Sequence, residues 1–217
     1  MKGKVFCIGM NKTGTTSLHT LFRQMGLRSY HGMYSDVVNL RDAGHPLFAE
    51  YDCFSDGEMH DYAFLDASFP AAKFILTTRR LDHWLASRIR HVHERRRLGK
   101  TGWMRKEYER DPAAAVRNWI TRRRDYHRGV LEYFRDRPDR FLVINVCDAD
   151  AADARPVARV AEFIGVPAPT IASLPWANRS RAPHADGGPQ ESPSPEEQVR
   201  RAFSDLNLPE DARTSEI

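Results

Sequence analysis

The chain has 217 residues, of which 41% are hydrophobic and 29% charged, and its formal net charge is +4. This composition is typical of a soluble globular protein with one large domain. No apolar run reaches the roughly eighteen residues that a membrane-spanning helix needs, so none is expected. The mild positive charge suits an anionic ligand but is too weak to indicate binding of nucleic acid.

The three cysteines, Cys7, Cys53 and Cys147, are widely spaced and lie in or beside apolar runs. This placement favours buried reduced thiols, and a metal site is not expected because metal-binding cysteines come in close pairs. The N-terminus leads straight into a predicted strand, so we expect no signal peptide and a cytoplasmic protein.

Short apolar strands alternate with longer amphipathic helices in the first half of the chain. The apolar run 5–8 predicts a buried strand, and Leu18, Leu21, Phe22 and Met25 predict a helix from about Thr15 to Gly26. The further elements expected here are strands over 28–31, 52–55 and 73–77, a helical turn over 37–40 and a helix over 62–69.

The second half is richer in helix. A helix is expected from Leu81, with a strongly basic later part at 88–97, and a long amphipathic helix over 116–134. The remaining elements expected are a strand over 141–146 and helices over 156–164 and 195–206. Residues 103–111 remain open, 181–195 reads as a Pro/Gly/Ser-rich loop, and a disordered tail is expected from Pro209.

Together these elements predict an α/β fold with a P-loop-like, three-layer architecture. A central parallel sheet of about four or five strands is flanked by helices, with strands 5–8 and 74–77 in the middle. Residues 1–181 would form this domain, and 182–217 a loop, a short helix and a tail. In such sheets ligands bind beyond the carboxyl ends of the strands.

The loop between the first strand and the first helix has the residue types of a phosphate site. Gly14 allows close approach of the backbone, Lys12 supplies a positive charge, and Thr15, Thr16 and Ser17 supply hydroxyl donors. Backbone N–H groups at the start of the helix add partial positive charge. The sequence therefore predicts that residues 9–17 bind a phosphate group.

This loop departs from a nucleotide-binding Walker A loop, because Lys12 stands two residues before Gly14 instead of directly after it. The core Lys-Thr-Gly-Thr-Thr-Ser resembles the 5′-phosphosulfate loop of sulfotransferases that use 3′-phosphoadenosine-5′-phosphosulfate (PAPS), above all their short bacterial and fungal members. The resemblance implies that Lys12, Thr13, Gly14, Thr15, Thr16 and Ser17 bind the 5′-phosphosulfate.

A second segment resembles the same family. Arg79 follows a predicted strand and Ser87 stands eight positions later, which is the spacing of the arginine and serine that bind the 3′-phosphate of PAPS in sulfotransferases. The Asn-Pro that often follows this arginine is replaced here by Arg80-Leu81. A basic segment near the C-terminus closes over the nucleotide in many members, and its candidate residues here are Asn178 and Arg179.

The resemblance also implies the chemistry. A PAPS-dependent sulfotransferase moves a sulfuryl group to a hydroxyl or amine acceptor on a glycan, lipid or natural product, and releases adenosine 3′,5′-bisphosphate without a metal. Lys12 would stabilise the leaving group. A base from the region after the third strand would take the acceptor proton, with Asp56 first and Glu58 and His60 behind it.

Two alternatives remain open at this point. A P-loop kinase or NTPase would use Mg²⁺ held by a loop hydroxyl and a strand-end aspartate, for which Asp148 is the candidate. A non-catalytic module that binds a nucleotide or nucleic acid is the other. The arginine runs 95–97 and 122–124 read as solvated faces, or as a rim that attracts an anionic cofactor or acceptor.

Overall fold

A computed structural model describes residues 3–32, 37–38, 41–56, 60–148, 153–169, 194–208 and 210–217. The chain divides into two compact units. We call Met1–Thr78 with Gly129–Arg179 the sheet unit, and Arg79–Arg128 with Ser180–Ile217 the helical unit. The long helix α7 (Pro112–Tyr133) contributes residues to both.

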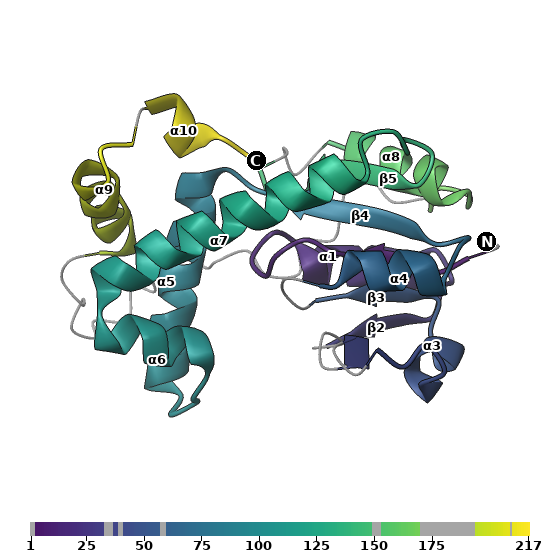
Figure 1. Cartoon of the computed structure of the whole chain (residues 1–217), viewed down its shortest axis with the longest axis horizontal. Helices are drawn as coiled ribbons and strands as arrows, with labels where there is room; N and C mark the ends of the chain where they lie inside the picture. Colours follow the sequence, from purple (N-terminus) through teal and green to yellow (C-terminus); the bar gives the residue numbers. More distant parts are fainter. Residues whose placement is uncertain are drawn as a thin grey trace. The chain divides into compact units, whose positions relative to one another are not determined.

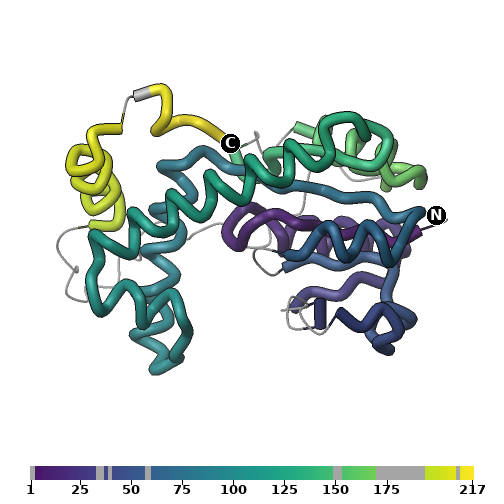
Figure 2. The backbone as a smooth tube through the Cα atoms, in the orientation of Figure 1, coloured from purple at the N-terminus to yellow at the C-terminus, as the bar shows by residue number. Residues whose placement is uncertain are grey.

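The sheet unit is built on five parallel strands in the order β2-β3-β1-β4-β5. The strands are β1 (Val5–Cys7), β2 (Ser29–His31), β3 (Cys53–Ser55), β4 (Lys73–Thr78) and β5 (Phe141–Asn145). Figure 2 traces the chain through them. Strand β1 is central with β4 beside it, so the α/β fold class and the central strands predicted from the sequence are confirmed.

One face of this sheet is covered by α1 (Thr15–Gln24) and α8 (Arg155–Ile164). Alternate residues of the strands, such as Val5 and Cys7 of β1, point to this face and pack against Leu18, Leu21 and Val160 of the two helices. The period-2 pattern of the strands and the helical spacing of α1 therefore meet in one aliphatic core.

The opposite face carries an aromatic core. The ring of Phe6 lies 5.1 Å from that of Phe54 and 5.7 Å from that of Phe74, on the two neighbouring strands. Three rings cover these: Phe48 of α3 (Pro46–Glu50), Phe69 directly after α4 (Tyr62–Ser68), and Phe134 directly after α7. Figure 1 shows α4 in front of the sheet, which gives the three layers expected from the sequence.

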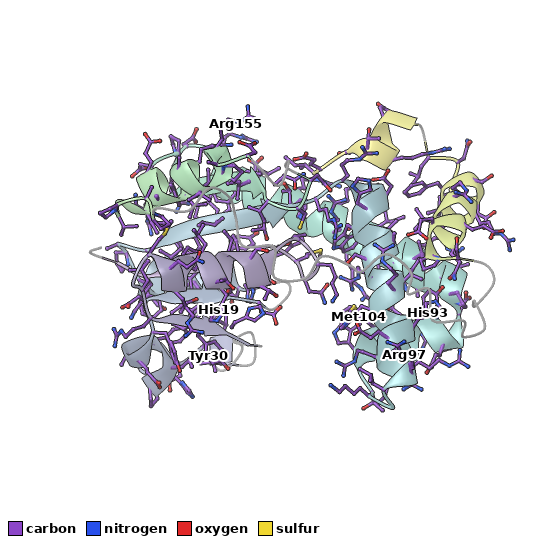
Figure 3. All side chains as sticks on the ribbon, turned by 180° about the vertical axis from the view of Figure 1, so that it is seen from behind. His19, Tyr30, His93, Arg97, Met104 and Arg155 are labelled. Atoms are coloured by element: carbon purple, nitrogen blue, oxygen red, sulfur yellow. The ribbon has the colours of Figure 1, made fainter. Side chains whose placement is uncertain are left out.

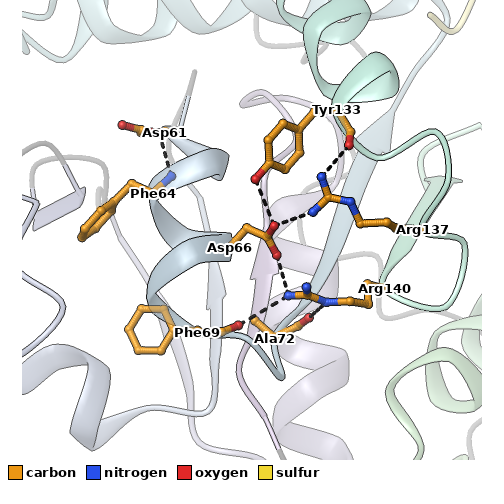
Figure 4. Close-up of polar contacts among 8 residues, drawn as sticks. All are labelled: Asp61, Phe64, Asp66, Phe69, Ala72, Tyr133, Arg137 and Arg140. Atoms are coloured by element: carbon orange, nitrogen blue, oxygen red, sulfur yellow. Dashed lines mark hydrogen bonds and ion pairs between the residues drawn. The ribbon is translucent and has the colours of Figure 1, made fainter.

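A buried carboxylate ties α4 to the end of α7 (Figure 4). Asp66 accepts a hydrogen bond of 2.9 Å from the hydroxyl of Tyr133 and forms ion pairs of 2.5 Å with both Arg137 and Arg140. Arg140 also donates to the carbonyl of Ala72, just before β4. The buried carboxylate is thus paired with two partly exposed guanidiniums, so the cluster ties the helices over the aromatic face without leaving the buried negative charge unpaired.

The helical unit is organised around α5 (Leu81–Arg97), against which α6 (Trp103–Arg110), α9 (Pro195–Asp205) and α10 (Glu210–Thr214) pack. Its core holds an arginine. The guanidinium of Arg88 is fully buried, 4.7 Å from the ring centre of Trp84 and 4.8 Å from that of Trp119. Stacking of an arginine between aromatic faces offsets part of the cost of burying its charge.

The structure adds elements to those predicted. Residues 46–50 and 103–110 are helical, and the predicted disordered tail is wrong for 210–214, which form α10. That helix is followed by Ser215, whose carbonyl accepts a 2.9 Å hydrogen bond from Leu81 N–H, so a tertiary contact compensates for the polar sequence.

All three cysteines are free, and burial raises the pKa of the Cys7 and Cys53 thiols. Among the described helices, none is long and apolar enough to span a bilayer.

Candidate functional site

The carboxyl ends of the parallel strands bring several of the predicted residues to one edge of the sheet unit. The loop that follows β1 leads to α1, and His31 is the last residue of β2. Asp56 directly follows β3, whose Ser55 pairs in register with His31. This edge therefore combines a phosphate-loop sequence, an imidazole and a carboxylate.

Two glycines fix the path of the loop because no side chain fits at either position. A Cβ atom on Gly9 would lie 1.9 Å from Thr77 Oγ1 of β4, and one on Gly14 would lie 2.2 Å from a methyl group of Val146. Gly14 also has φ +94°, in the left-handed region. The loop is thus pressed against the ends of β4 and β5, and α1 starts directly after it.

Lys12 has a φ of 67°, which is uncommon for a residue with a side chain. This conformation costs on the order of 1–2 kcal/mol and persists where the surroundings hold it. Lys12 is half-buried in the turn between the two glycines. Strain of this kind is frequent at functional sites, which agrees with the role predicted for this lysine.

The hydroxyl groups of the loop divide into two sets. Thr13 is fully buried; its Oγ1 donates to the carbonyl of Met10 and lies 2.6 Å from Thr77 Oγ1. Its side chain therefore braces the loop from inside. Thr15 is buried, whereas Thr16 and Ser17, in the first turn of α1, are half-buried.

The N-terminus of α1 has neither a capping side chain nor an acidic residue in its first turn. Side chains cap α3, α4 and α9, whereas α5, α6 and α8 lack a side-chain cap as α1 does. The first N–H groups of a helix need acceptors, and the positive end of the helix dipole favours an anion. With Lys12 beside it, this end of α1 has the donor set of a phosphate site.

His31 is a residue of this edge that sequence reasoning missed. Its Nε2 lies 3.1 Å from Thr16 Oγ1, and its Nδ1 lies 2.8 Å from the carbonyl oxygen of Ser55. Its ring stacks on that of His19 of α1, labelled in Figure 3, with centroids 5.2 Å apart. The available signal was its position at the carboxyl end of a correctly predicted strand.

The three candidate bases differ in their settings. Asp56 has a φ of 99° and a half-buried side chain at the sheet edge. His60 is buried, and this burial lowers its pKa to about 3, so it is a weak proton acceptor. Glu58 lies outside the described residues.

Two further predicted binding residues, Arg79 and Ser87, belong to the helical unit. Arg79 follows β4 directly and Ser87 lies on α5, and both side chains are half-buried. The backbone at Arg79 is held by Arg123 of α7, whose Nη2 donates to the Arg79 carbonyl over 2.6 Å and to the Glu216 carbonyl over 2.5 Å. Asn178 and Arg179 lie outside the described residues.

The basic runs are not uniformly solvated. Within 122–124, Arg122 pairs with Glu107 over 2.7 Å, Arg123 is buried, and Arg124 is exposed. Arg88, at the start of the basic part of α5, is buried among tryptophans. These arginines have structural partners in the helical unit.

A family model described as a sulfotransferase domain matches residues 4–182, most of the chain. The chain belongs to the sulfotransferase family. No curated protein matches it. This sulfotransferase carries the phosphate-loop sequence, Asp56, Arg79 and Ser87 within the matched span, whereas α9 and α10 lie beyond it.

Membership of the family makes the protein an enzyme that transfers a sulfuryl group. In the part of the sulfotransferase that the structure describes, no three His, Cys, Asp or Glu residues are grouped as a metal site. Asp148, the candidate Mg²⁺ ligand of the kinase alternative, accepts a 2.9 Å hydrogen bond from the side-chain amide of Asn145. That amide group fixes the turn after β5, since its oxygen accepts from the Cys147 N–H.

Proposed function

We propose that this sulfotransferase uses PAPS as its donor and binds the 5′-phosphosulfate with residues 9–17. The observation that carries the proposal is the loop itself: Lys12 at φ 67° and Gly14 at φ 94° lead into a helix N-terminus without a side-chain cap. Backbone N–H groups, an ammonium group and the hydroxyls of Thr15, Thr16 and Ser17 suit a phosphate dianion. The buried Thr13 would act by bracing this loop.

The 3′-phosphate of the nucleotide is assigned to the helical unit. Arg79 would bind it with a two-pronged contact and Ser87 with its hydroxyl, as the spacing of eight residues in the family's segment implies. Asn178 and Arg179 are proposed to contact the nucleotide as well. The contacts of Arg123 with the Arg79 carbonyl support this assignment because they hold the turn that carries Arg79.

The proposed reaction is an in-line transfer. The acceptor is a hydroxyl or amine, on a glycan, lipid or natural product; its oxygen or nitrogen bonds to sulfur while the bond from sulfur to the 5′-phosphate oxygen breaks. Lys12 stabilises the charge that develops on that leaving oxygen. Asp56 takes the acceptor proton, with Glu58 as the next candidate, because His60 is buried with a lowered pKa.

A thermal-shift comparison tests the donor. Adenosine 3′,5′-bisphosphate, the expected product, should raise the melting temperature without a metal, and by more than ATP with Mg²⁺ does. At a ligand concentration 100 times Kd the stabilisation is about 2.7 kcal/mol. If ATP with Mg²⁺ stabilises the protein and the bisphosphate does not, the PAPS proposal is wrong and a kinase or NTPase takes its place.

A further inference from the structure

His31 forms a hydrogen bond with Thr16, and either the imidazole or the hydroxyl group can be its donor. Its Nε2 and the Thr16 Oγ1 are 3.1 Å apart, so one of them donates to the other. Thr16 is in the first turn of α1, among the hydroxyls that we assign to the 5′-phosphate. The direction of this hydrogen bond decides where the single hydroxyl proton of Thr16 points.

The other ring nitrogen has a fixed role. Nδ1 of His31 lies 2.8 Å from the carbonyl oxygen of Ser55, and a carbonyl oxygen only accepts, so Nδ1 carries a proton. The Ser55 hydroxyl, 3.3 Å from Nδ1, donates its own proton to the carbonyl of Tyr30. Both contacts of Nδ1 on β3 therefore require the ring to be the donor.

With Nδ1 protonated, the charge state of the ring sets the Thr16 proton. In a neutral ring Nε2 has only a lone pair, so the Thr16 hydroxyl donates to it and offers its oxygen lone pairs elsewhere. In an imidazolium Nε2 donates to Thr16, and the hydroxyl proton is released for another acceptor. A phosphate oxygen needs that proton, and its negative charge also favours the imidazolium.

We propose that His31 is a positioning residue that turns the Thr16 hydroxyl toward the donor's 5′-phosphate, and that it takes up a proton when this phosphate binds. The inference rests on the proposed function, because it requires a phosphate at residues 9–17. It adds a residue from β2 to a site otherwise built from the loop after β1. Binding of the donor and of the product is thereby linked to pH.

The charged groups around the ring are few in the described part of the sheet unit. From α1, His19 stacks on His31, and its pKa is lowered by burial, by His31 and by Arg23. From the β3 side, Ser55 is uncharged and is followed by Asp56. Lys12 is on the loop before α1. A bound phosphate would add two negative charges to this group.

Isothermal titration calorimetry with adenosine 3′,5′-bisphosphate measures the proton directly. At pH 7.5, titrations in buffers of different ionisation enthalpy give the number of protons taken up on binding. The wild-type protein should take up as much as one proton more than His31→Gln. The affinity of wild type relative to His31→Gln should rise as the pH falls, by at most tenfold per pH unit.

Two further variants separate this role from a structural one. Thr16→Val lacks the hydroxyl and should lose the extra uptake, whether or not His31→Gln folds well. His19→Gln is the matched control: this ring stacks on His31 and its Nδ1 is hydrogen-bonded to Ser29, so the Thr16–His31 pair is retained and the uptake should remain. Equal uptake in wild type, His31→Gln and Thr16→Val overturns the inference while leaving the bisphosphate site intact. If the bisphosphate does not bind the wild-type protein, the proposed function fails, and the inference with it.

Discussion

Thr13, in the loop between β1 and α1, and Thr77 of β4 share a hydrogen bond, with their Oγ1 atoms 2.6 Å apart and both side chains fully buried. Because the single proton of Thr13 goes to the Met10 carbonyl, Thr77 is the donor of this bond. Thr77 therefore donates to Thr13, and Thr13 donates to the Met10 carbonyl. The central strand β4 thus fixes the shape of a loop that is 64 residues away in sequence.

Thr13→Val should destabilise the protein by about 1–3 kcal/mol, because the Met10 carbonyl and the Thr77 hydroxyl lose their buried partner. Thr77→Val should also destabilise it. Their costs should not add in the double variant, since the bond is already broken in either single variant. Urea unfolding of the four proteins measures this coupling, and additive costs would show that the two hydroxyls do not interact.

Two replacements of Lys12 should differ from each other in stability but lose activity equally. Lys12→Gly should be about 1 kcal/mol more stable than Lys12→Ala, because φ 67° is strained for alanine and free for glycine. Both variants should lose roughly 10²- to 10³-fold in kcat with PAPS, the scale for one transition-state donor. Urea unfolding and sulfuryl-transfer assays measure the two effects. Full turnover in either variant would remove Lys12 from the mechanism.

Arg79→Ala should weaken bisphosphate binding by about 1.5–3 kcal/mol through loss of a charged contact, and Ser87→Ala by about 1 kcal/mol. Arg123→Met should weaken it less than Arg79→Ala, because Arg123 acts through the Arg79 carbonyl. Calorimetric Kd values give the comparison.

A double variant and a neighbour control this test. Arg123→Met should add little in an Arg79→Ala background, since there is then no guanidinium left to position. The exposed Arg124→Met should bind like wild type. If the losses of binding free energy from Arg79→Ala and Arg123→Met add in the double variant, Arg123 supports binding through the helical unit and not through the position of Arg79.

Two buried histidines predict how stability depends on pH. Burial lowers the pKa of His60 to about 3, and burial with the charge of Arg123 lowers the pKa of His127 to about 3. Unfolded histidines titrate near 6.5, so below that pH the unfolded chain binds more protons and stability falls as pH falls.

The slope of the unfolding free energy between pH 6 and 4 should include about 1.4 kcal/mol per pH unit for each of these histidines. His127→Gln should reduce the slope by that amount. Urea unfolding at a series of pH values measures the slope. An unchanged slope in His127→Gln would show that His127 is protonated in the folded protein.

Local patterns accounted for the sheet and for the tight turn between β1 and α1, because apolar runs, helical spacing and the glycines around Lys12 act over a few residues. The parts that the sequence did not reveal depend on long-range contacts. His31 meets Thr16 and Ser55 only after the sheet forms. Likewise Arg88 is buried because tryptophans of α5 and α7 surround it, although its sequence neighbours are those of a solvated helix.

The most direct test of the account is a ³¹P NMR spectrum of adenosine 3′,5′-bisphosphate bound to the protein, which reports its two phosphates separately. Relative to wild type, Lys12→Ala should shift the 5′-phosphate resonance and leave the 3′-phosphate nearly unchanged. Arg79→Ala should do the reverse. If Lys12→Ala leaves the bound 5′-phosphate resonance at its wild-type position, residues 9–17 do not hold this phosphate and the central claim is contradicted.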